Sequence, residues 1–135
     1  MNQEIKQKWI VALRSGNYKQ GRELLCIVNE KKEEEYCCLG VLCEIAAKEN
    51  IVEKTKFLDC DFFRYGISGY VLSTEVMSWA AIDSSLAELP ANLCFHKDGG
   101  IISCNHNSKP INLGVLNDAY NLTFDEIADV IEKYL

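Results

Sequence analysis

The C-terminal segment constrains the fold more than any other part of the sequence. Thr123 and Glu126 have the spacing of a capping box, in which each side chain accepts a hydrogen bond from the other residue's backbone N–H. Apolar residues then recur every three or four positions, at Ile127, Val130, Ile131 and Tyr134. One face of this helix must be buried, so the sequence predicts a globular core against which it packs.

The N-terminal segment carries a second pattern of the same kind. It predicts a helix over residues 3–14, with Asn2 as its N-cap and Gly16 as the left-handed residue that ends it. The apolar positions recur at helical spacing between lysines and glutamines, at Ile5, Trp9, Ala12 and Leu13. Both ends of the chain are therefore expected to belong to the folded domain.

Strand-type patterns lie between these two helices. The apolar runs 24–28 and 36–38 flank the charged run 29–35, which predicts a hairpin with an exposed tip. Residues 93–96 and 101–104 flank an Asp-Gly-Gly turn, a second hairpin signal. Further helices are expected over 39–49, from an N-cap at Ser73, and over 113–119, while residues 51–72 are expected to be irregular. The prediction is one small α+β domain over residues 1–135, with helices packed against short antiparallel β-hairpins.

Composition narrows the function classes. The net charge is −6, from 14 basic and 20 acidic residues, so binding to a DNA or RNA duplex is not expected. The chain has neither an apolar run of roughly 18 residues nor an export signal at its start, which predicts a cytoplasmic protein without membrane contact. The seven cysteines are an odd number, and in a reducing compartment we expect free thiols and no structural disulfide.

No motif of the sequence indicates catalysis. The Gly-rich phosphate loops, the Gly-x-Ser-x-Gly elbow and closely spaced Cys-x2-Cys pairs are all missing, so we expect no enzyme and no cofactor. One metal site stays open as an alternative. Cys94 and His96 are two apart, as are Cys104 and His106, and the four side chains could meet across the second hairpin.

The segment after the first helix is the best candidate for a ligand site. It concentrates arginine, lysine, tyrosine and amide side chains around two glycines, Gly16 and Gly21. These residues are Arg14, Tyr18, Lys19, Gln20 and Arg22. Guanidinium groups bind phosphate in a bidentate manner, and aromatic rings stack on bases. These residues suit a small anionic, nucleotide-like ligand, with Trp9 or Tyr18 stacking on the base. The other interpretation is a polar connection whose arginines pair with surface acids.

Several stretches resemble a family of small proteins common in phages and prophages. The motifs are WxxALRSGxYxQG within residues 9–22, YCCLGVLC at 36–43, and Leu116-Asn117-Asp118 followed by LTFDEIA at 122–128. The likeness covers both ends of the chain and leaves out residues 50–110. It brings no activity, but it implies a phage protein that acts in the host cytoplasm. Some small phage proteins capture cyclic nucleotide signals of host immunity in pockets between subunits, which implies a homo-oligomer.

Three hypotheses follow. The first is a non-enzymatic phage accessory protein that sequesters a nucleotide-like signal and counters host defence. In it, Arg14, Lys19 and Arg22 hold phosphate, while Asn117 or Asp118 reads polar edges. The second is an inhibitor that binds a host protein through an acidic surface. The third is a small metal-dependent enzyme built on the four Cys and His residues of the second hairpin.

Overall fold

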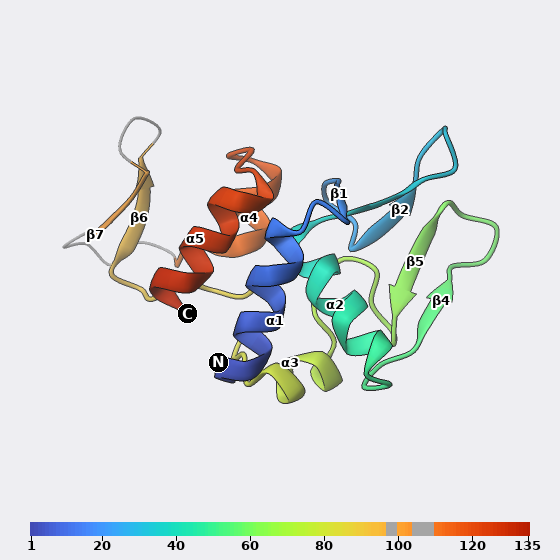
Figure 1. The fold of residues 1–135 in the computed structure, drawn as a ribbon, viewed down its shortest axis with the longest axis horizontal. Coiled ribbons are helices and arrows are strands. Elements are labelled where there is room, and N and C mark those ends of the chain that lie inside the picture. Colours follow the sequence, from blue (N-terminus) through green and yellow to red (C-terminus); the bar gives the residue numbers. More distant parts are fainter. Residues whose placement is uncertain (97–99, 104–109) are drawn as a thin grey trace.

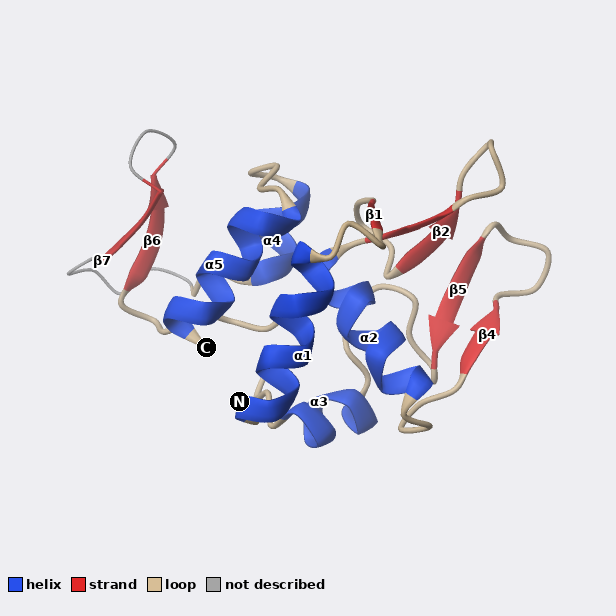
Figure 2. Cartoon of the chain, viewed as in Figure 1, coloured by secondary structure: helices blue, strands red, loops and turns tan. Residues whose placement is uncertain are grey.

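The computed structural model describes residues 1–96, 100–103 and 110–135. Its helices are α1 (Gln3–Arg14), α2 (Cys38–Lys48), α3 (Thr74–Ala80), α4 (Leu113–Asp118) and α5 (Phe124–Tyr134). They form the centre of the molecule, between a sheet on one side and a hairpin on the other (Figure 1, Figure 2). The architecture is α+β, as the sequence predicted. None of the helices in the described ranges has the length and apolar character that crossing a membrane requires.

The larger sheet has five strands in the order β1-β3-β2-β5-β4. They are β1 (Lys19–Gln20), β2 (Cys26–Val28), β3 (Glu34–Tyr36), β4 (Lys54–Lys56) and β5 (Phe62–Tyr65). The pairs β2–β3, β2–β5 and β4–β5 are antiparallel. The hairpin expected around the charged run is thus confirmed. The second hairpin, β6 (Leu93–His96) with β7 (Gly100–Ser103), is antiparallel as predicted and stands apart from the sheet (Figure 1).

Two segments differ from the expectation. Residues 51–72 contain β4 and β5, which extend the sheet, where an irregular segment was expected. The strands are short, and their aromatic residues lie between glycines and polar residues, so no clear alternation marks them. Residues 19–20, expected to be loop, form β1, which pairs with β3 in parallel. A two-residue strand depends on its neighbour and leaves no local pattern in the sequence.

The helix ends follow the predicted capping. The Asn2 side chain accepts hydrogen bonds from the N–H groups of Glu4 and Ile5, and Gly16 has a φ of +72°. Thr123 and Glu126 form the capping box. The buried stripes of α1 and α5 pack on each other, and α1 also packs on α2. Ile127 and Ile131 are fully buried in this core, so the docking of the C-terminal helix is confirmed.

The cysteines divide into two groups. Cys26, Cys37, Cys38, Cys43 and Cys60 are free, and the first four are buried in the core, where they act as small hydrophobic side chains. Cys94, by contrast, is disulfide-bonded. The expectation that the protein has no disulfide is therefore wrong for this hairpin.

Candidate functional site

Three of the predicted ligand-binding residues share one hollow. Arg14 at the end of α1, Tyr18 in the following turn and Gln20 in β1 line a space of about 260 Å³. Its opposite wall is the N-terminus of α5, with Thr123, Phe124 and Asp125. The sequence thus identified three residues that lie together. The wall contributed by α5 adds an acid, Asp125, to the hollow.

The Arg14 guanidinium group is already bound by acids. Its Nη2 donates hydrogen bonds to Asp129 and, at 3.0 Å, to Glu132, both on the exposed side of α5. These bonds, first that to Glu132 and then that to Asp129, raise the pKa of Arg14. A phosphate at this position would compete with two carboxylates. This pairing of Arg14 with surface acids is what we expect if the segment is a polar connection and not a ligand site.

The neighbouring residues point to different places. The Tyr18 hydroxyl accepts a hydrogen bond of 2.9 Å from Lys48 Nζ, and the ring lies edge-on to Tyr36. Lys19 Nζ lies 3.4 Å from Glu33 and lines a separate hollow with residues of the β2–β3 turn. Arg22 is exposed and forms no ion pair with any residue that the structure describes. Lys19 and Arg22 therefore do not converge with Arg14 on one ligand.

Two predicted ligand residues are inaccessible. Trp9 is fully buried in the core, and its indole N–H donates a hydrogen bond of 3.0 Å to the Cys38 carbonyl oxygen. Asn117 is also fully buried. The expectations that Trp9 stacks on a base and that Asn117 reads polar edges are wrong for this conformation, because a ligand cannot reach either side chain.

Asn117 instead joins three parts of the fold. Its Oδ1 accepts hydrogen bonds from Gln20 Nε2 at 2.9 Å and from the Cys38 N–H at 3.3 Å. Its Nδ2 donates to the Gly21 carbonyl oxygen at 3.0 Å. Gln20 also donates to the Leu122 carbonyl oxygen at 2.8 Å and accepts from the Phe124 N–H at 3.2 Å. The two amides therefore hold β1, α2 and the α4–α5 connection together.

A charged cluster that the sequence did not reveal lies between the sheet and α2. Lys54 Nζ on β4 is 2.7 Å from Glu34 on β3 and 3.1 Å from Glu44 on α2. The Tyr36 hydroxyl donates to Glu34, and the Tyr65 hydroxyl donates to Glu44 at 2.7 Å. The alternation that places Lys54 opposite Tyr65 was hidden in the segment taken as irregular.

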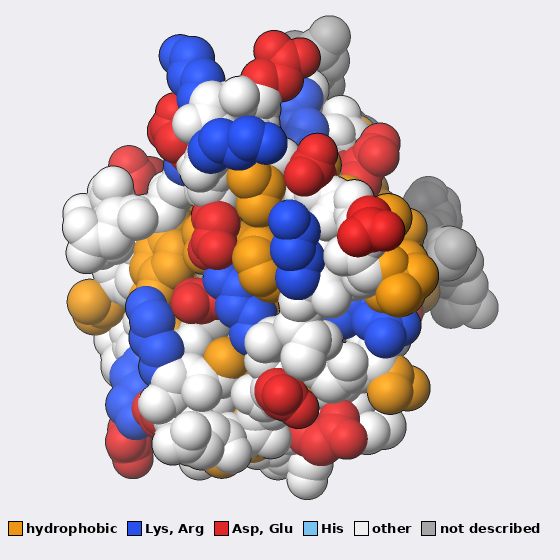
Figure 3. Space-filling model, turned by 90° about the vertical axis from the view of Figure 1, so that its right-hand side faces the viewer, with side chains coloured by type: hydrophobic (Ala, Val, Ile, Leu, Met, Phe, Trp, Pro, Cys, Tyr) orange, Lys and Arg blue, Asp and Glu red, His pale blue; other side chains and the backbone are white. Residues whose placement is uncertain are grey.

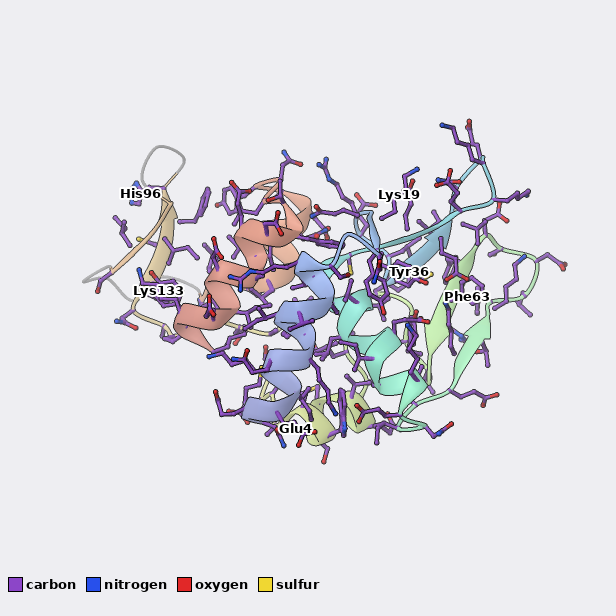
Figure 4. All side chains as sticks on the ribbon, in the orientation of Figure 1. Glu4, Lys19, Tyr36, Phe63, His96 and Lys133 are labelled. Atoms are coloured by element: carbon purple, nitrogen blue, oxygen red, sulfur yellow. The ribbon has the colours of Figure 1, made fainter. Side chains whose placement is uncertain are left out.

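The electrostatics of this cluster indicate a structural role. Although burial opposes it, the hydrogen bond to Glu34 raises the pKa of Lys54, so this amine stays charged and is not a nucleophile. Burial raises the pKa of the adjacent Cys26 thiol to about 11 and that of Cys37 to about 12. Neither thiol is a thiolate at neutral pH. The cluster fixes α2 on the sheet (Figure 4, where Tyr36 and Phe63 are labelled).

The alternative metal site falls partly outside the described residues. Cys104 and His106 lie there, while Cys94 is disulfide-bonded and so is no thiolate ligand. His96 is exposed on β6, at the other end of the molecule from Lys19 and Tyr36 (Figure 4). No group of three or more His, Cys, Asp or Glu side chains in the described part of the chain is arranged to hold a metal ion.

Asp118 belongs to a different surface, which we call the acidic hollow. This depression of about 340 Å³ lies between the start of α4 and the segment after β5, and is lined by Glu23, Tyr70, Val71, Leu86, Asn112, Gly114, Val115, Asp118 and Ala119. Tyr70 is 60% exposed and Val115 37%. Asp118 Oδ1 accepts from the Glu23 N–H at 3.0 Å and from Asn117. Neither carboxylate forms an ion pair with a described residue, and no basic side chain lines the hollow.

A family match covers residues 1–135. The chain belongs to DUF8296, a domain of unknown function. No curated protein and no solved structure matches it. Membership of DUF8296 brings no known activity, so the function has to be argued from the surfaces of this chain.

One larger depression of this DUF8296 domain has mixed chemistry. A groove of about 450 Å³ separates α5 from the β6–β7 hairpin, with Phe95, Ile101, Val130 and Tyr134 among its apolar walls. Its charged residues include both acids and a lysine, and each of them already contacts another side chain or a helix end. Asp129 binds Arg14, Glu126 belongs to the capping box, and Lys133 lies over the Tyr134 ring. The acidic hollow is smaller, but its charge is of one sign and is not neutralised.

Proposed function

We propose that this protein is a non-enzymatic binding protein that docks on another protein through the acidic hollow. The observation that carries the proposal is the pair of unneutralised carboxylates, Glu23 and Asp118, beside exposed apolar side chains. A partner segment with a Lys or Arg next to an apolar side chain would satisfy both parts of the hollow. Charge of one sign on such a surface steers association and excludes partners of like charge.

The apolar part of the hollow supplies the contact area. Tyr70, Val71, Leu86 and Val115 are its apolar and aromatic lining residues. Aromatic residues are enriched at protein interfaces, because a rigid ring buries much area at little cost in conformational entropy. Asp118 is held by two hydrogen bonds, so its carboxylate is oriented before a partner arrives.

The proposed biological context comes from the resemblance to phage proteins. A phage accessory protein that binds a host factor through an acidic surface would inhibit or redirect that factor. We propose this context together with the docking surface. The net charge of −6 supports a basic partner surface.

The test is a selection of short random peptides with the purified protein as bait. We expect enrichment of peptides with Lys or Arg beside Leu, Ile or Phe, and binding that weakens as salt screens the charges. The double variant Glu23→Lys, Val115→Lys should bind the enriched peptides about tenfold more weakly or worse, because it places two positive charges in the hollow. Asp83→Lys is the matched control, because Asp83 is also an exposed acid but lies outside the hollow. Equal binding by both variants would refute the proposal.

A second candidate is the binding of a small nucleotide-like ligand, which one observation favours. Arg14, Tyr18 and Gln20 line the same hollow beside α5. In this case mono-, di- or cyclic nucleotides should raise the melting temperature, because a ligand at 100 times its Kd stabilises the native state by about 2.7 kcal/mol. Arg14→Ala should abolish that shift while leaving the ligand-free melting temperature nearly unchanged. A panel without any shift in the wild type removes this candidate.

A further inference from the structure

The β4–β5 hairpin presents an aromatic surface on the side of the sheet that faces away from α2. Side chains alternate along β5, so Phe63 and Tyr65 face Lys54 and α2, while Phe62 and Arg64 face the other way. Phe57 stacks on Phe62 with ring centroids 5.0 Å apart. The Arg64 guanidinium carbon lies 4.4 Å from the centre of the Phe57 ring. We call Phe57, Leu58, Asp59, Asp61, Phe62 and Arg64 the hairpin patch.

Charges of both signs in the hairpin patch lack ion-pair partners among the residues that the structure describes. Arg64 makes no ion pair with any described residue, and its Nε is buried without a hydrogen-bond acceptor. Asp59 and Asp61, on the turn of the same hairpin, are exposed and likewise form no ion pair in the described ranges. A buried donor without an acceptor destabilises the folded chain. The patch thus carries a guanidinium group and two carboxylates that could form an ion pair but do not pair with each other within one copy.

Leu58 adds an apolar residue at the tip of this hairpin. Its side chain is 78% exposed, and its φ of +46° lies in the left-handed region that non-glycine residues rarely adopt. A leucine in strained backbone at an exposed tip is not explained by the packing of a single chain. It is explained if a partner covers the tip.

We propose that the hairpin patch is the contact between two copies of this chain, related by a two-fold axis. In a two-fold interface both copies contribute the same patch. If one residue of the first copy contacts a second residue of the other copy, the symmetry-related contact forms as well. Arg64 of each copy pairs with Asp59 or Asp61 of its partner, and the Phe57 and Leu58 side chains pack around the axis. This arrangement gives the Arg64 guanidinium group a carboxylate partner and covers the exposed tip.

A second copy fits better than an unrelated partner, because the patch is complementary to itself. Figure 3 shows the end of the molecule that carries β4 and β5, where exposed hydrophobic side chains lie among both acidic and basic ones. The acidic hollow has one sign of charge and would repel its own copy. The dimer contact is therefore distinct from the proposed docking surface, although Tyr70 lines the hollow and its ring lies 6.1 Å from that of Phe62.

The test is sedimentation equilibrium of the full chain over a range of concentrations. We expect the wild type to dimerise, and Arg64→Glu and the double variant Asp59→Arg, Asp61→Arg each to dissociate at least about tenfold more readily. Mixing the two variants should restore a dimer, since their reversed charges complement each other. Arg22→Glu, a reversal at an exposed arginine outside the patch, should leave the association unchanged.

Two further measurements keep the proposal open to refutation if Arg64→Glu unfolds. Leu58→Asp changes an exposed tip and should also weaken the dimer. Cys60 lies between the two aspartates and is the exposed one among the free cysteines of the described chain. A bis-maleimide reagent should therefore join two copies, and Cys60→Ser should abolish the product. A wild type that stays monomeric, or variants that dimerise like it and do not pair when mixed, would overturn the proposal.

Discussion

Replacing Gly40 with alanine should lower the free energy of unfolding by at least about 4 kcal/mol, a loss seen only when a substitution disrupts the core or the backbone. In most helices the same change stabilises the protein by up to about 1 kcal/mol, because alanine has the higher helix propensity. Here a Cβ at Gly40 would lie 1.7 Å from the Leu25 carbonyl oxygen. Backbone would have to move away from backbone, so the sign reverses. Urea denaturation followed by circular dichroism measures the difference.

Gly114→Ala is the matched comparison, since Gly114 lies in α4 and its neighbours are side chains. The nearest atom to a Cβ there is Asn112 Oδ1 at 3.2 Å, followed by Leu86 Cδ2 at 3.4 Å. Side chains can yield where a backbone carbonyl cannot, so this variant should stay within about 1 kcal/mol of the wild type. If Gly40→Ala is as stable as Gly114→Ala, then α2 does not approach the backbone of Leu25 as closely as the structure shows.

The elements that the sequence predicted correctly have a local cause. The Asn2 cap, the Ser73 cap and the Thr123–Glu126 capping box depend on hydrogen bonds between residues two or three positions apart. Such bonds form wherever the backbone begins a helix, so the residue types alone identify them. The β2–β3 hairpin was predictable for a related reason, because a charged tip between two apolar runs describes the turn directly.

The elements that the sequence missed depend on distant partners. β1 is two residues long and exists because Lys19 and Gln20 lie beside Glu35 and Tyr36. β4 and β5 sit in a segment whose aromatic residues divide between the two faces of the sheet, with Phe63 and Tyr65 inside and Phe62 outside. Composition does not reveal which aromatic residue faces which side until the sheet is assembled.

Residue type was a weaker guide to the site than to the fold. Trp9, Arg14 and Asn117 are residue types that suit a nucleotide, but each of these side chains bonds to another part of the chain. Trp9 fills the core and Arg14 binds two acids of α5, more than 100 residues away in sequence. The Lys54 cluster shows the reverse case, in which ordinary surface residue types form a half-buried network between β3, β4 and α2. The contacts of the predicted site residues and those of the Lys54 cluster both depend on tertiary structure, which a local sequence motif does not reveal.

The Asn117 side chain is fully buried and bonds to two backbone groups far away in sequence, so its removal should be costly. Asn117→Ala leaves the buried Gly21 carbonyl oxygen and the Cys38 N–H without their partner. At about 1–3 kcal/mol for each orphaned group, plus a small cavity, we expect a loss of about 3–5 kcal/mol. Thermal and urea denaturation would measure it.

Two comparisons separate this effect from the loss of any asparagine. Asn17→Ala removes an exposed side chain that makes no hydrogen bond to the described residues, and it should change the free energy of unfolding by less than about 0.5 kcal/mol. Asn117→Asp keeps an acceptor for Cys38 but loses the donor to Gly21 and places a second carboxylate beside Asp118. It should therefore be at least as unstable as Asn117→Ala, because a buried carboxyl group replaces the amide that bonds to Gly21. If Asn117→Asp is instead as stable as the wild type, the donor to Gly21 contributes nothing. The contact between β1, α2 and α4 would then be stabilised by packing alone.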